Sequence, residues 1–432
     1  MAPSPAIDAR PGVIMNSDRQ DDTTLLARIT GRRALDAAAC ALAAVALVWM
    51  GYQFWRLVFQ RGVSRAVDLH LRHGECQEWF EGVSIYATRV DAVYPPATYV
   101  MLWPLLGWLE WPAVRVFWCL VTLLSIVWMC RLAVTYGEVT EPRRRRLLWL
   151  MPLACYPVGA TVGNGQISIL VVACLFAGLM LLARERPSWR RDLTIAVLML
   201  GALMKPSVSA FFFWILVFAP GGLRAACLVG TGYVALTYAA SLAQDSGPIE
   251  LMDAWLERAR AGMLWGSSRG GGAIVNGTDG LEITGINLAS ILSVAGSQAL
   301  TLPVTVAALA LLGAWILWRR RARLLSLLGV TAIVARFSVY HGWYDDVLML
   351  IPLVALIAWA RGGASARSRA MAGWLSLGFG LSLLAPGGIY SLPRALANAY
   401  AIGQSVCWLA GLVFLSWTAR SPVRDRRVIA SE

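Results

Sequence analysis

Twelve long apolar runs, each close to the length that crosses a membrane, are the feature that most constrains this chain. A membrane-spanning helix needs about 20 apolar residues, and 58% of the 432 residues are hydrophobic whereas only 15% are charged. A soluble domain carries about 25% charged residues. The composition therefore excludes a soluble enzyme, a disordered chain and a secreted disulfide scaffold, and it predicts an all-α, polytopic bundle of transmembrane helices. The runs lie at roughly 35–59, 112–133, 147–162, 166–183, 192–204, 207–219, 223–241, 298–318, 324–338, 346–360, 370–386 and 401–418.

Clusters of arginine between these runs predict the topology. They lie at 143–146, 184–191, 319–323, 361–369 and 420–427. Basic residues gather in cytoplasmic loops, and about twelve crossings with both termini in the cytoplasm satisfy their alternation. The net charge of +13 is then explained by topology, so we expect membrane lipids as partners and no nucleic acid.

This topology divides the chain into three parts and leaves two substantial outer loops. Residues 1–33 are polar and predict a disordered cytoplasmic arm, 34–418 form a single transmembrane domain, and 419–432 are a cytoplasmic tail. The outer loops lie at about 60–111 and 242–297.

Two segments strain the count of spans. Counting Pro95 to Trp111 as a span would place the arginines at 143–146 outside, so we expect a helix lying in the outer membrane interface. The runs 192–204 and 207–219 are short and are divided by Lys205-Pro206. They form either two short spans or one broken span, and two crossings keep most of the later arginines inside.

Asp68 and Lys205 are the ionisable residues with the strongest functional interpretation. Asp68 lies about ten residues beyond the first apolar run, where a carboxylate can act as general base toward a sugar hydroxyl; the alternative is a solvated loop acid. Lys205 is the only lysine and lies in an apolar stretch, where a charge usually marks a substrate path; the alternative is a lysine that extends to the headgroups.

A short outer segment near residues 336–346 adds further polar candidates. Arg336 and His341 flank it, and a guanidinium suits phosphate recognition. Asp345 and Asp346 could bind a cation, but adjacent carboxylates on a helix diverge by about 100°, so we favour hydrogen bonding. The sequence requires no metal and no cofactor.

Several short elements, in this order, resemble glycosyltransferase family 87, the bacterial polyprenol-phosphate-mannose-dependent mannosyltransferases and their relatives in the C-type membrane glycosyltransferase superfamily. The resemblance covers residues from about 35 to about 360. It rests on Asp68, Gly82-Val83-Ser84-Ile85-Tyr86, Tyr94-Pro95-Pro96, Gly163-Asn164-Gly165-Gln166, the segment from Gly201 to Pro206, Gly285-Ile286-Asn287-Leu288, and the segment from His341 to Asp346.

The resemblance implies a fold of about twelve spans plus an outer interfacial helix, and an enzyme on the outer face of the bacterial cytoplasmic membrane. Such an enzyme moves a hexose, in the first place mannose, from a polyprenyl-phosphate sugar to a lipid or glycan acceptor. It implies Asp68 as catalytic base, and Lys205 and His341 as residues of the lipid-phosphate site. The remaining predicted substrate-binding residues are Arg336, Tyr94, Gln166 and Tyr344.

A transporter or a lipid flippase is the alternative class, since about twelve spans suit it equally well. Transporters commonly contain internal repeats and polar sites at mid-membrane. We find no convincing repeat in this sequence, and its polar residues concentrate at the outer ends of the spans. A cluster of Asp68, Lys205 and His341 at one mouth of the bundle would favour sugar transfer.

Overall fold

The computed structural model describes residues 17–60, 66–268, 274–277, 280–283, 286–339, 341–388 and 392–419. Almost all of its regular structure is helical, as predicted, and the strands in these ranges form one two-stranded antiparallel sheet in which Ile274 pairs with Ile283. The elements are α1 (Ser17–Val58), α2 (Val67–Phe80), α3 (Ile85–Thr88), α4 (Pro96–Leu106), α5 (Trp111–Tyr136), α6 (Pro142–Ala154), α7 (Tyr156–Asn164), α8 (Ser168–Arg184), α9 (Trp189–Ala202), α10 (Pro206–Ser209), η1 (Ala210–Phe212), α11 (Phe213–Phe218), α12 (Leu223–Ser241), α13 (Pro248–Ser268), β1 (Ile274–Gly277), β2 (Gly280–Ile283), α14 (Leu288–Val294), η2 (Gln298–Leu300), α15 (Thr301–Trp318), α16 (Leu324–Ser338), η3 (Trp343–Met349), α17 (Leu350–Gly362), α18 (Ala366–Leu383) and α20 (Arg394–Thr418).

Six helices in the described ranges are long and apolar enough to cross a membrane, which makes the chain a multi-pass membrane protein by helix composition. They are Arg32–Val58, Trp111–Tyr136, Leu223–Ser241, Thr301–Trp318, Trp343–Gly362 and Arg394–Thr418. Further helices are apolar but shorter, namely Pro96–Leu106, Ser168–Arg184, Pro206–Phe218 and Leu324–Ser338.

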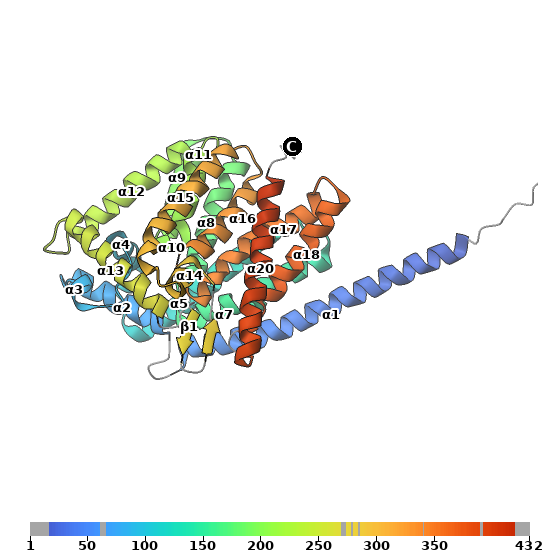
Figure 1. Cartoon of the computed structure of the whole chain (residues 1–432), viewed down its shortest axis with the longest axis horizontal. Helices are drawn as coiled ribbons and strands as arrows, with labels where there is room; N and C mark the ends of the chain where they lie inside the picture. The colour runs from blue at the N-terminus through green and yellow to red at the C-terminus, as the bar shows by residue number, and fades with distance from the viewer. Residues whose placement is uncertain are drawn as a thin grey trace, which may run out of the picture.

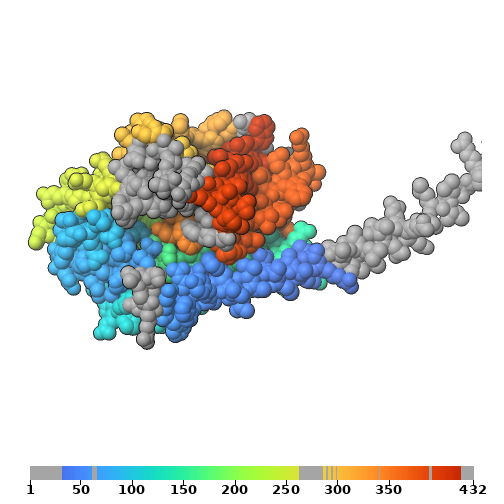
Figure 2. Space-filling model, turned by 60° about the horizontal axis from the view of Figure 1, so that its bottom comes forward, coloured from blue at the N-terminus to red at the C-terminus, as the bar shows by residue number. Residues whose placement is uncertain are grey.

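The helices pack into one bundle in which α8 takes a central place (Figure 1). Helix α8 is buried along most of its length and contacts α5, α9 and η3. A helix that is apolar on all sides belongs in such a core. The C-terminal part of α1 packs on α6 and α7 and lies along one edge of the bundle, as its blue surface in Figure 2 shows.

The two segments that strained the count of spans both form short helices. The expected interfacial helix is α4, which has 11 residues. In the other segment α9 ends at Ala202 and α10 begins at Pro206, so the chain breaks at Lys205. A proline disfavours helical geometry in the residue before it, and Lys205 accordingly has φ −128° and ψ 82°.

Parts of the predicted domain boundaries fall outside the described residues. This holds for residues 1–16 of the predicted arm and for 420–432 of the predicted tail, whereas the rest of the arm continues into α1. The outer loop predicted at 242–297 contains α13, the β1–β2 hairpin and α14.

A buried ion pair fixes the junction of α8, α9 and α12. Arg191 is 2% exposed and donates to the Asp192 carboxylate, with Nη2 to Oδ1 at 2.6 Å. It also donates to the backbone oxygens of Glu185 and Gly221, at 3.2 Å and 2.6 Å. Arg224 contacts the other carboxylate oxygen of Asp192. One carboxylate therefore holds two arginines and three chain segments together.

We expect Asp192→Ala to destabilise the protein by about 3–5 kcal/mol, because a buried arginine would lose its partner. The measurement is the thermal unfolding of the purified protein in detergent. Arg190→Ala, at an exposed neighbouring position, is the control and should leave the unfolding temperature nearly unchanged. Equal unfolding temperatures for the two variants would contradict this account of the junction.

Candidate functional site

Asp68 lies in the first turn of α2, where the helix N-terminus favours a negative charge. The helix follows Ala66, which is buried and has φ 36° and ψ 45°. A left-handed backbone is unusual for a residue with a side chain, and such positions cluster at functional sites. The Asp68 side chain is half-buried, so it is held by the fold and still reachable from outside.

The segment Gly163-Asn164-Gly165-Gln166 forms the tight turn between α7 and α8. Gly165 follows the last residue of α7 and has φ +68°, the conformation that glycine adopts at helix ends. A Cβ atom on Gly165 would lie 2.4 Å from the Cβ of Leu69. The missing side chain therefore lets α2 pack directly on this turn, which places Asp68 beside Gln166.

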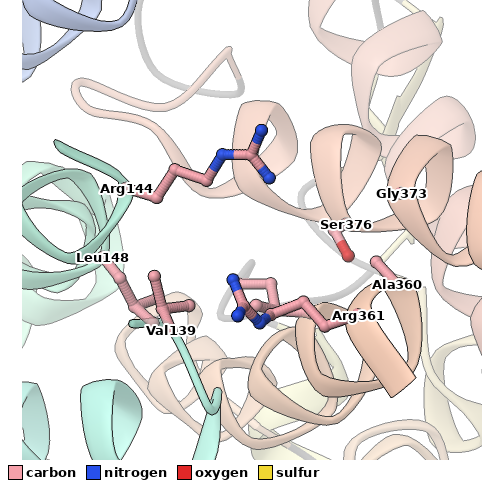
Figure 3. Close-up of a pocket in the computed structure, with 8 residues that line it drawn as sticks. Val139, Arg144, Leu148, Ala360, Arg361, Gly373 and Ser376 are labelled. Carbon is pink, nitrogen blue, oxygen red and sulfur yellow. The ribbon is translucent and has the colours of Figure 1, made fainter. Parts of the chain in front are cut away.

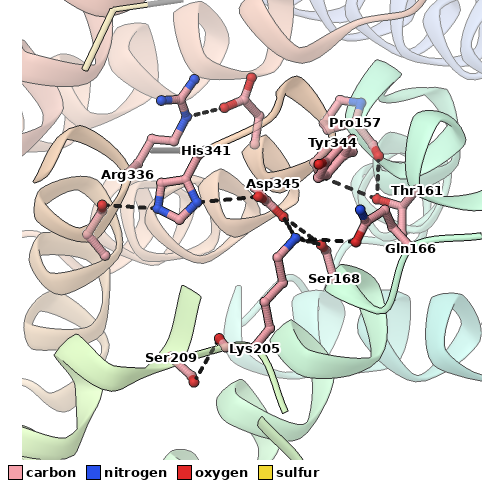
Figure 4. Close-up of polar contacts among 12 residues, drawn as sticks. Pro157, Thr161, Gln166, Ser168, Lys205, Ser209, Arg336, His341, Tyr344 and Asp345 are labelled. Carbon is pink, nitrogen blue, oxygen red and sulfur yellow. Dashed lines mark hydrogen bonds and ion pairs between the residues drawn. The ribbon is translucent and has the colours of Figure 1, made fainter. Parts of the chain in front are cut away.

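Lys205 points from the break before α10 into this turn and is surrounded by oxygen acceptors (Figure 4). Its Nζ donates to Asp345 Oδ1 at 2.6 Å, Ser168 Oγ at 3.0 Å and Gln166 Oε1 at 3.3 Å. Lys205 is 7% exposed, so it does not extend to the lipid headgroups, which was the alternative interpretation. An ammonium group has three N–H donors, and all three are in use.

Asp345 joins Lys205 to His341. It accepts hydrogen bonds from Lys205 and from Ser168 Oγ, the latter at 2.6 Å, and its Oδ2 lies 3.4 Å from His341 Nδ1. The other ring nitrogen of His341, Nε2, lies 3.1 Å from the backbone oxygen of Ala335.

Asp68 belongs to the same cluster. Its carboxylate is hydrogen-bonded to Gln166 and interacts electrostatically with Arg72, Lys205 and Asp345. Burial raises the pKa of Asp68, and the nearby Arg72 and the Gln166 hydrogen bond oppose that rise. Since Gln166 Oε1 faces Lys205, its amide NH₂ is the group that donates to Asp68.

The two predicted tyrosines both lie beside this cluster. The Tyr344 ring faces Lys205, with Nζ 4.8 Å from the ring centroid, and its backbone oxygen accepts from Thr161. The Tyr94 ring lies under the Arg72 guanidinium, 4.6 Å from centroid to Cζ, and interacts electrostatically with Lys205. Five of the predicted substrate-binding residues therefore lie around Asp68.

Arg336, the sixth, belongs to a neighbouring but separate ion pair. It contacts Asp346, which also accepts a hydrogen bond from the Tyr156 hydroxyl. The Arg336 guanidinium lies 5.6 Å from the centre of the Trp408 ring, and Figure 4 shows it pointing away from Lys205. The structure therefore engages Arg336 inside the bundle and not in the Lys205 cluster.

The adjacent aspartates have different partners, as the hydrogen-bonding interpretation predicted. They lie in η3, a 3₁₀-helix with three residues per turn, so successive side chains point about 120° apart. Asp345 contacts Lys205, whereas Asp346 contacts Arg336. Over the described parts of the chain, no group of three or more His, Cys, Asp or Glu side chains is placed to hold a metal ion.

Sequence reasoning missed two residues of the site. Ser168 bridges Lys205 and Asp345, and a serine at the start of an apolar helix carries no distinctive signal. Arg72 was also missed. It is 6% exposed, pairs with Glu75 at 2.5 Å and acts on Asp68 one helical turn away. The spacing of Asp68 and Arg72, four residues apart on a helix, could have indicated this contact.

We expect Gly165→Ala to destabilise the protein by about 1–2 kcal/mol from the backbone conformation alone, with a further loss because α2 must move away from the turn. The measurement is thermal unfolding in detergent. Gly201→Ala is the matched control, because the nearest atom to its added Cβ is Cys174 Sγ at 3.6 Å, an ordinary contact. If the two substitutions shift the unfolding temperature alike, the packing of α2 does not depend on Gly165.

A comparison with known protein families identifies the family of the chain. The model of glycosyltransferase family 87 matches residues 92–340, more than half of the chain. Asp68 precedes the matched region and His341 follows it directly. No curated protein and no solved structure matches the chain. The family match confirms the resemblance seen in the sequence motifs, and the chain belongs to glycosyltransferase family 87.

Proposed function

We propose that this glycosyltransferase moves a hexose, in the first place mannose, from a polyprenyl-phosphate sugar to a lipid or glycan acceptor. Asp68 acts as the general base, and the configuration at the anomeric carbon is inverted. Family membership already sets the chain apart from the transporter and flippase alternative. The finer assignment rests on one observation, the convergence of Asp68, Lys205 and His341 on a single cluster.

The chemistry at Asp68 is a direct displacement. The acceptor hydroxyl attacks the anomeric carbon while its proton passes to the Asp68 carboxylate. The new C–O bond forms as the bond between the anomeric carbon and the phosphate oxygen breaks, and its electron pair leaves with the phosphate. The acidic residues near Asp68 are engaged elsewhere, Asp345 by Lys205 and Glu75 by Arg72. Among the described residues near Asp68, no second carboxylate is free to act as nucleophile, and a single displacement inverts the anomeric centre.

We assign Lys205 and His341 to the phosphate of the donor. A fixed cation such as Lys205 stabilises a departing anion, and His341 lies against the same carboxylate, Asp345. The three N–H groups of Lys205 are all bonded, so a phosphate must displace one acceptor. Gln166 is the most distant of the three, at 3.3 Å. Gln166 also donates to Asp68. If the donor displaces Gln166 from Lys205, the hydrogen bond from Gln166 to the proposed base, Asp68, would therefore change as well.

We further propose about twelve crossings, with this cluster on the outer face of a bacterial cytoplasmic membrane. The proposal adds to the six candidate spans the shorter apolar helices Ser168–Arg184, Pro206–Phe218 and Leu324–Ser338. The remaining three crossings are α6 with α7, α9, which precedes the Lys205 break, and α18. The arginine clusters support the orientation, because they lie at the opposite ends of the helices from Asp68 under the predicted topology.

Asp68→Asn should abolish sugar transfer, because the amide cannot accept the proton. General base catalysis contributes about 10²–10⁴-fold, so we expect a loss of at least that order. The assay follows the label from purified polyprenyl-phosphate sugars, mannose first, into a membrane lipid extract. Glu78→Gln on the same helix is the control, because Glu78 pairs with Arg89 and not with the cluster. Turnover above a tenth of wild type in Asp68→Asn would contradict the proposed role.

The pH dependence of transfer should report the ionisation of Asp68. The base works only as a carboxylate, so kcat/KM should fall as the pH drops through a pKa that burial has raised above 3.8. Arg72 stabilises the Asp68 carboxylate. Replacing Arg72 should therefore shift the fall in kcat/KM at low pH to a higher pH, and kcat/KM at high pH should return to the wild-type value.

The double variant Arg72→Gln/Glu75→Gln is the suitable form of this test, because it removes both members of the buried pair and leaves no unpaired charge. Arg72→Lys retains the positive charge, so the fall in kcat/KM should occur close to the pH at which it occurs in the wild type. A pH profile that is unchanged in the double variant would show that Arg72 does not act on Asp68.

A further inference from the structure

A cavity lined by two arginines shares no residue with the Asp68 cluster. Its volume is about 180 Å³, and it lies between the loop that follows α5, helix α6, and helices α17 and α18. Figure 3 shows the side chains of Arg144 and Arg361 directed into this space from two sides. Neither residue has a part in the proposed transfer reaction.

The cavity lies at the level of a membrane surface. Two candidate spans end beside it, Trp111–Tyr136 and Trp343–Gly362. Below the arginines its walls are apolar and include Leu148 and Ile357. Gly373 forms part of the wall on α18, and a Cβ atom added there would meet nothing within 4 Å. The cavity therefore combines two charged side chains with apolar walls.

The two guanidinium groups are available to a ligand. Arg144 pairs with Glu141 at 2.8 Å, but both side chains are exposed, and such surface pairs contribute little. Arg361 Nη2 donates to Thr140 Oγ1 at 3.2 Å, and in the described part of the chain it has no carboxylate partner. The mouth keeps a net positive charge, and guanidinium groups bind phosphate through paired N–H donors.

From this arrangement we infer a binding site for an anionic phospholipid, with the headgroup phosphate between Arg144 and Arg361 and the glycerol and first acyl carbons against the apolar wall. A volume of about 180 Å³ is below the 300–1,000 Å³ of typical small-molecule sites, so it accommodates a headgroup and not a whole cofactor. Free phosphate would leave the apolar wall unused. Basic pockets between transmembrane helices are known to take such headgroups.

The site can be tested on the full-length protein in detergent without any transferase assay. Phosphatidylglycerol, phosphatidylcholine and inorganic phosphate are added separately, and binding is followed by native mass spectrometry and by the shift in unfolding temperature. We expect a phosphatidylglycerol adduct and an upward shift, and neither with phosphatidylcholine. Equal effects of both lipids, or an equal shift with inorganic phosphate alone, would overturn the assignment.

Two kinds of variant address the cavity. Replacing Arg144 and Arg361 by glutamine should weaken phosphatidylglycerol binding about fivefold for each charge removed. Gly373→Leu should remove the adduct while both charges remain, because the new side chain fills the cavity, and leucine is a better helix former than glycine.

Matched controls separate this site from general attraction between arginines and anionic lipid. Arg145→Gln removes one charge from an exposed position on the same helix, and Gly403→Leu adds the same side chain where a Cβ also meets nothing within 4 Å. Both should bind like wild type. The inference fails if Arg145→Gln weakens binding as much as Arg361→Gln, or if Gly373→Leu binds as wild type does.

Discussion

The ion pair between Lys205 and Asp345 joins the segments that form the candidate site of this bundle. An ammonium group buried without a partner would cost several kcal/mol, so the chain must bring a carboxylate to Lys205 wherever the bundle closes around it. Asp345 comes from η3, Ser168 from the start of α8, and Lys205 from the break before α10. One charged contact therefore fixes three segments that are far apart in the sequence, and Gln166 extends the arrangement to Asp68.

This pairing changes what Lys205 can contribute to donor binding. As a free cation it would attract phosphate with its full charge, but next to Asp345 most of that charge is compensated. The phosphate group must then compete with Gln166, Ser168 and Asp345 for the same three N–H donors. In the proposed reaction the bridging oxygen of the leaving phosphate gains negative charge, which strengthens its interaction with Lys205 relative to the ground state. Interactions that strengthen in the transition state are the ones that accelerate the reaction.

The sequence predicted which residues meet more successfully than how they pair. Asp68 and Lys205 are recognisable because ionisable groups near or within apolar runs are few, and each has a definite position relative to the runs. The partner of Lys205 was not predictable, since Asp345 and Asp346 are equivalent in the sequence and only the 3₁₀ geometry of η3 separates them. The sequence does not fix the number of crossings for a related reason. Helices such as α8 and α16 are shorter than a full span. Their apolar character reflects burial in the bundle as much as contact with lipid.

The second buried pair, Arg336 with Asp346, holds η3 in the bundle through contacts that are separate from those of the neighbouring Lys205 cluster. Asp346 receives a hydrogen bond from Tyr156, whose hydroxyl in turn accepts one from Gln404 Nε2 at 3.2 Å, so this pair ties η3 to α7, α16 and α20. Asp345, the next residue along the chain, is anchored through this neighbour even if a phosphate displaces one of the contacts of Lys205. The adjacent carboxylates of Asp345 and Asp346 therefore have different roles. Asp346 secures η3 within the helices, whereas Asp345 faces Lys205, whose hydrogen bonds rearrange in the proposed binding of the donor.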